Sequence, residues 1–86
     1  MNHSLREYTR QAFAEVLGTG PTARNAEINV LNWAIARTRA MGREASWENR
    51  VFKSLYRQKV AWLLTEFKRG GHVSVALGSK WGGKAA

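Results

Sequence analysis

The chain contains no cysteine and no aspartate among its 86 residues. The lack of cysteine excludes disulfide bonds, thiolate zinc sites and cysteine nucleophiles. All six acidic residues are glutamates scattered along the chain, and the two histidines, His3 and His72, lie in opposite terminal regions. Metal sites need several converging ligands, so we expect no metal ion here.

Long apolar runs are missing as well. No run approaches the roughly 20 residues that cross a bilayer. The N-terminus also lacks the uninterrupted apolar stretch of a secretory signal. We therefore expect neither a membrane span nor a secretory leader.

Patterns typical of catalysis are absent too. The turn Gly18-Thr19-Gly20-Pro21 precedes a helix but lacks the Lys-Ser/Thr pair of a phosphate-binding loop. Glu27 and Glu48 are the candidates for an acid and a base, but nothing nearby in the sequence indicates a cleft. We expect each to be a solvated or helix-capping carboxylate. The sequence thus predicts a protein that is not an enzyme and that takes no cofactor and no small-molecule substrate.

What the chain has in excess is positive charge. Fourteen lysines and arginines stand against six glutamates, which gives a formal net charge of +8. A balance this basic in one small domain suggests a polyanionic partner, such as nucleic acid or an acidic protein surface. Solubility alone is the alternative explanation.

Apolar residues recur at spacings of three and four in three segments, which is typical of amphipathic helices. These segments run from Ser4 to Leu17, from Thr22 to Met41 and from Ser46 to about Arg69. Each begins at a residue that can act as an N-cap, and Ser4 with Glu7 has the spacing of a capping box. Gly42 is suited to the C′ position after the second helix.

Short glycine-marked connections between three such helices predict an all-α fold, a three-helix bundle over residues 1–71. After Gly71 the helical period stops, and residues 72–86 are rich in glycine and lysine. We expect this segment to be an extended basic tail.

The third segment separates an apolar face from a cationic one. At 100° per residue four of its cations, Arg50, Lys53, Arg57 and Lys68, cluster within about 60°, and the apolar face is centred about 140° away. This arrangement suits a helix that packs on one side and meets a polyanion on the other, although a solvated polar face is the simpler reading. The candidate binding residues are Arg50, Lys53, Arg57, Lys68 and Arg69 of the third segment, Arg37, Arg39 and Arg43 at the end of the second, and Lys80, Trp81 and Lys84 of the tail.

Two tryptophans fall off the main apolar stripes. We expect Trp33 at the rim of the core, with exposure to a partner as the alternative. Trp62 lies about 100° from the apolar centre of the third helix. An exposed Trp62 favours a structural component whose apolar surface matters more than its charges.

A known family carries a similar set of residues. The run Glu27-x-x-x-Leu31-Asn32-Trp33-Ala34-Ile35 is followed, after about ten residues, by Ser46-Trp47-Glu48-Asn49-x-x-Phe52-x-x-x-Tyr56-x-x-Lys59. Over about residues 5–69 the chain resembles the central domain of transcription elongation factor S-II, closest to the versions in large DNA viruses.

The resemblance implies a three-helix bundle that docks on RNA polymerase. The family adds a separate zinc ribbon, in which an Asp-Glu pair stimulates transcript cleavage. This chain has no cysteine for a ribbon and no aspartate. The resemblance therefore implies docking without the cleavage-stimulating activity.

The sequence thus predicts a small basic binding module that docks on RNA polymerase or nucleic acid. The alternative is a structural component of a virion or another large complex. A shorter match, Leu55-Tyr56-Arg57 with Phe67 downstream, is similar to the motif of mitochondrial LYR assembly proteins. That family carries its motif in the first helix, whereas here it lies in the last.

Overall fold

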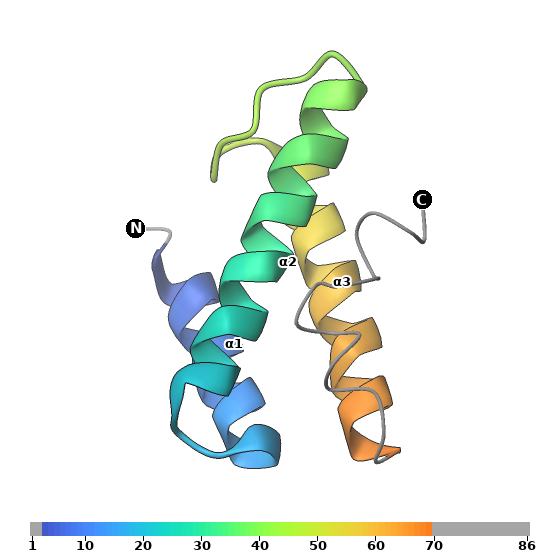
Figure 1. Cartoon of the computed structure of the whole chain (residues 1–86). Coiled ribbons are helices and arrows are strands. Elements are labelled where there is room, and N and C mark those ends of the chain that lie inside the picture. The colour runs from blue at the N-terminus through green and yellow to red at the C-terminus, as the bar shows by residue number, and fades with distance from the viewer. Residues whose placement is uncertain (1–2, 70–86) are drawn as a thin grey trace.

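A computed structural model describes residues 3–69, which form three α-helices. The helices are α1 (His3–Leu17), α2 (Pro21–Ala40) and α3 (Arg50–Lys68). Consecutive helices run antiparallel and pack side by side (Figure 1). The predicted all-α three-helix bundle is therefore confirmed. The predicted tail, with Lys80, Trp81 and Lys84, lies outside the described residues.

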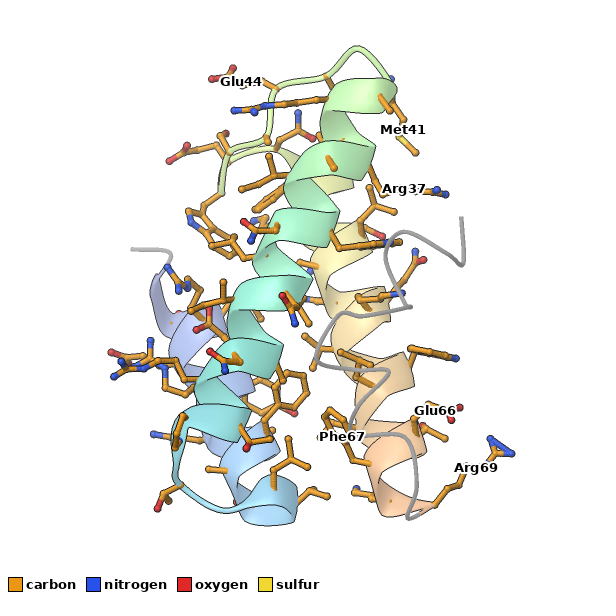
Figure 2. All side chains as sticks on the ribbon, in the orientation of Figure 1. Arg37, Met41, Glu44, Glu66, Phe67 and Arg69 are labelled. Atoms are coloured by element: carbon orange, nitrogen blue, oxygen red, sulfur yellow. The ribbon has the colours of Figure 1, made fainter. Side chains whose placement is uncertain are left out.

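Each helix contributes one apolar face to a single core. The fully or almost fully buried apolar residues are Phe13 of α1, Ala23, Ala26, Val30 and Ala34 of α2, and Phe52, Tyr56, Val60, Leu63 and Phe67 of α3. The buried apolar residues of α2 are mainly alanines. Their small size lets the larger side chains of α1 and α3 contact each other. The rings of Phe13 and Phe67 meet edge to face, 5.4 Å between centroids. Figure 2 shows Phe67 pointing from α3 towards α1.

The two ends of the bundle differ. α1 covers only the half of α2 nearest the α1–α2 turn, so α2 and α3 alone form the other end (Figure 1). The connection between α2 and α3 closes that end with a half-buried Trp47. The Trp47 indole packs edge to face on Phe52 and Tyr56, with centroid distances of 4.9 and 5.1 Å.

The helix ends depart from the predicted caps. α1 begins at His3, which places Ser4 inside its first turn. α2 begins at Pro21 with Gly20 in the N-cap position, so Thr22 is not the cap. Proline suits the first helical position because its φ is already helical and an N–H there would have no partner. Gly42 takes a φ of +76° after α2, as expected of a C′ glycine.

α3 begins three residues later than predicted. Asn49 is its N-cap, and the Oδ1 atom accepts hydrogen bonds from the amides of Val51 at 2.8 Å and Phe52 at 3.3 Å. Ser46 instead caps a turn ahead of the helix, where its hydroxyl accepts from the amide of Glu48 at 3.3 Å. The prediction of Ser46 as the cap was wrong, because Asn49, an equally good capping residue, takes that position three residues further on.

The expectation for Glu27 was also wrong. Its side chain is fully buried, not solvated or capping. The Oε2 atom accepts a hydrogen bond from Arg6 Nε at 2.5 Å, and Arg10 Nη2 lies 3.8 Å from Oε1. A carboxylate can remain in an apolar interior only when cations and hydrogen bonds offset its lost hydration. Arg6 and Arg10 thus tie α1 to the middle of the core.

Tyr56 lies in the same polar region of the core. Its hydroxyl is buried and makes no hydrogen bond of ordinary geometry. Thr9 lies beside it, but the Thr9 hydroxyl donates to the carbonyl oxygen of Leu5 at 2.8 Å. Burial, aided by the negative charge of Glu27, raises the pKa of the Tyr56 phenol to about 12, although Thr9 acts in the opposite direction.

The geometry of the ion pair predicts that Arg6 contributes more to stability than Arg10 does. We expect Arg6→Met to lower the free energy of unfolding by about 3 kcal/mol, because it leaves a buried carboxylate with a single distant cation. Arg10→Met should cost clearly less, since Arg10 is half-exposed and farther from Glu27. Urea unfolding measures both. In the double variant Arg6→Met with Glu27→Leu, most of the loss should be recovered, and equal losses for the two arginines would contradict this account.

The raised pKa of the Tyr56 phenol predicts that the fold loses stability at alkaline pH. Because the pKa of Tyr56 is higher in the folded chain than the ordinary value near 10, the folded state holds the proton more tightly. This contribution is complete below about pH 10 and disappears as the pH rises towards 12. Thermal unfolding from pH 8 to 12 should show the decline, and Tyr56→Phe should flatten it. An unchanged decline in Tyr56→Phe would assign it to another group.

Candidate nucleic-acid interface

The predicted cations of α3 lie along one side of the helix. Arg50, Arg57 and Lys68 are exposed, and Lys53 is half-buried. Within residues 3–69, ion pairs join Arg6 and Arg10 to Glu27 and Arg69 to Glu66, so these four cations make none. We call Arg50, Lys53, Arg57 and Lys68 the α3 cationic row. At 1.5 Å per residue it extends over about 27 Å.

The α3 cationic row borders a shallow groove between α1 and α3. The groove has a volume of about 240 Å³ and is lined by Arg57 together with Leu5, Tyr8, Thr9, Val60, Ala61 and Leu64. Tyr8 is 60% exposed there, the largest exposure among the big apolar side chains of residues 3–69. At Arg57 the row is therefore flanked by an aromatic and apolar strip.

Of the three arginines predicted near the end of α2, Arg43 lies close to the α3 cationic row. Arg43 and Arg50 line the same open hollow at the α2–α3 connection, together with Glu48. Glu48 offsets part of the positive charge in that hollow. Arg43 therefore extends the row only weakly.

Arg37 and Arg39 point in different directions. The Arg37 guanidinium lies over the ring of Trp33, 5.4 Å from its centroid, and the side chain extends on the side of α3 (Figure 2). Arg39 is exposed two residues later, which is about 200° further around the helix. Arg39 therefore faces away from α3, in agreement with a helix-dipole role for a cation in the last turn.

Arg69 follows the end of α3. Its Nη1 atom lies 3.2 Å from Oε2 of Glu66, one turn earlier (Figure 2). A surface pair of this kind contributes at most about 1 kcal/mol and is easily exchanged for another anion. Lys80, Trp81 and Lys84, the remaining predicted contacts, lie outside the part of the chain that the structure describes.

One group of side chains was missed in the sequence. Lys59 of α3 places its ammonium 4.5 Å from the ring centroid of Trp33 and 4.7 Å from that of Trp62. Trp33 is half-buried against the core, as predicted, and Trp62 is 44% exposed. The signal was present as a spacing of three between Lys59 and Trp62, which places them on one face. Their meeting with Trp33 needs the packing of α2 on α3.

Two further findings hold for residues 3–69. No three histidine or glutamate side chains gather closely enough to hold a metal ion. No helix in that range is both long and apolar enough to cross a bilayer.

The N-cap at Asn49 sets where α3 starts and therefore where Arg50 and Lys53 stand. We expect Asn49→Ala to lower the free energy of unfolding by about 1 kcal/mol, because two amides of the first turn lose their acceptor. Ser46→Ala is the matched control and should cost less than half as much. Urea unfolding of both variants, followed by circular dichroism, distinguishes them, and a larger loss for Ser46→Ala would place the start of α3 at the predicted position.

Comparison of the chain with models of known protein families, with curated proteins and with solved structures gives no match.

Proposed function

We propose that this bundle is a small, non-enzymatic binding module whose partner is nucleic acid. The observation that carries the proposal is the α3 cationic row, whose four cations make no ion pair with any residue from 3 to 69. Cations that stabilise a fold are normally paired with acidic groups, as Arg6 is with Glu27. Cations held together without such partners raise the positive potential of one side and attract a polyanion.

The balance of charge over the whole chain supports the same partner. The net charge is +8, and the core ion pair of Arg6 with Glu27 leaves this excess of positive charge unchanged. Contacts of lysine and arginine with phosphates release counterions, so affinity should fall steeply as salt rises. Four phosphate contacts correspond to a slope of roughly −3 to −4 in a plot of log K against log salt.

A protein partner is the second candidate. Tyr8 is 60% exposed and Trp62 is 44% exposed, and large aromatic side chains at a surface are typical of protein interfaces. The resemblance to the elongation-factor domain suggests that such a partner is RNA polymerase. The exposed Trp62 suggests in addition a structural role in a virion or another large complex.

Charge reversal on α3 tests the first candidate. We expect Arg50→Glu with Arg57→Glu to abolish binding to DNA while leaving helicity unchanged, because both side chains are exposed. The matched control is Arg24→Glu with Arg39→Glu, which changes the net charge by the same amount with two exposed arginines of α2. Fluorescence anisotropy with labelled DNA at 50 and 200 mM salt gives the affinity and the salt slope.

Two results would count against the α3 cationic row as the nucleic-acid surface. One is unchanged binding by the α3 double variant. The other is an equal loss in the α2 control, which would mean that only net charge matters. Gel filtration without DNA covers the protein alternative, since self-association that does not depend on salt favours an assembly component.

A further inference from the structure

Two indoles and two cations meet on the side of the bundle where α2 packs on α3. The ammonium of Lys59 lies 4.5 Å from the centroid of Trp33 and 4.7 Å from that of Trp62. The guanidinium of Arg37 lies 5.4 Å from the centroid of Trp33. We call these four residues the tryptophan–cation cluster. It is separate from the α3 cationic row, because Trp62 and Arg57 differ by about 140° around α3.

The cluster has a supporting part and an outer part. Trp33 and Lys59 are half-buried, and Trp33 packs against the core. Trp62 is 44% exposed and Arg37 is exposed. The inner pair therefore holds the position of the Trp62 ring, while the outer pair can meet a partner.

The electrostatics of the cluster favour an anion. Arg37 and Lys59 share the Trp33 ring and carry charges of the same sign. Burial, and after it the positive charge of Arg37, lowers the pKa of Lys59. An anion placed beside Arg37 relieves this repulsion.

We propose that the tryptophan–cation cluster binds a nucleotide of a single-stranded nucleic acid, whose base stacks on Trp62 and whose phosphate pairs with Arg37. Stacking on an aromatic ring next to cations is the general means by which proteins hold single strands without reading sequence. A duplex offers no free base face, because each base is covered by its neighbours. This inference rests on nucleic acid being the partner.

The position of the cluster also favours a single strand. The α3 cationic row and the cluster lie on different sides of one helix that is about 10 Å wide. A ligand that contacts both must bend around α3 within a few nucleotides. A duplex, with a persistence length of about 150 base pairs, resists such a bend, whereas a single strand does not.

Substitution of the exposed ring is the direct test. We expect Trp62→Leu to weaken the binding of a labelled 12-nucleotide single strand about tenfold or more, because the stacking contact is lost. Trp62→Phe, which keeps an aromatic face, should retain most of the affinity. Both variants and the wild type are measured by anisotropy with the single strand and with a duplex of the same length.

The control is Ile28→Ala, which removes an exposed apolar side chain of α2 that belongs neither to the tryptophan–cation cluster nor to the α3 cationic row. It should leave single-strand affinity within twofold. Arg37→Gln should weaken single-strand binding and reduce its salt slope by about one, as expected of one phosphate contact.

The outcomes separate this inference from the function it rests on. If Trp62→Leu binds the single strand as the wild type does, or loses affinity equally for single strand and duplex, the cluster is not the proposed site. The α3 cationic row then remains as the nucleic-acid surface. If the wild type binds neither ligand at 50 mM salt, the proposed function fails and the inference fails with it.

Discussion

A single carboxylate in the core determines much of this structure. Glu27 is fully buried in the N-terminal half of α2, and the cost of burying it unpaired far exceeds the stability of a small domain. The pairing with Arg6 joins residues 21 apart and fixes how α1 lies against α2. Because α1 is fixed in this way, Phe13 meets Phe67, and the groove bordered by the α3 cationic row takes its shape. A buried ion pair of this kind contributes little net stability compared with an apolar pair, but removing one of its partners is strongly destabilising.

The residues that carry the family resemblance are largely residues that hold the helices together. Glu27 makes the core ion pair, Asn49 caps α3, and Trp47 covers Phe52 and Tyr56. Their spacing therefore follows from the packing of three helices. The surfaces proposed for binding are built mainly from other positions. A similarity in these internal residues therefore indicates a similar architecture. The partner has to be identified from the residues at the surface.

The number of helices and most of the core could be predicted from the sequence, because apolar residues at spacings of three and four report the buried faces directly. The start of α3 could not be predicted, since Ser46 and Asn49 are both good caps. The burial of Glu27 was not predicted, because its partner Arg6 lies on another helix. The tryptophan–cation cluster depends in the same way on a contact between α2 and α3. The periodicity of residues within one helix does not predict which side chains of two different helices will meet.

The short α1 leaves one end of the bundle to two helices. α2 and α3 form a hairpin of neighbouring segments that is closed by Trp47 at its own end (Figure 1). The cations of both proposed binding surfaces stand on these two helices. α1 therefore acts on these surfaces through the core, where Arg6 pairs with Glu27 and Phe13 meets Phe67.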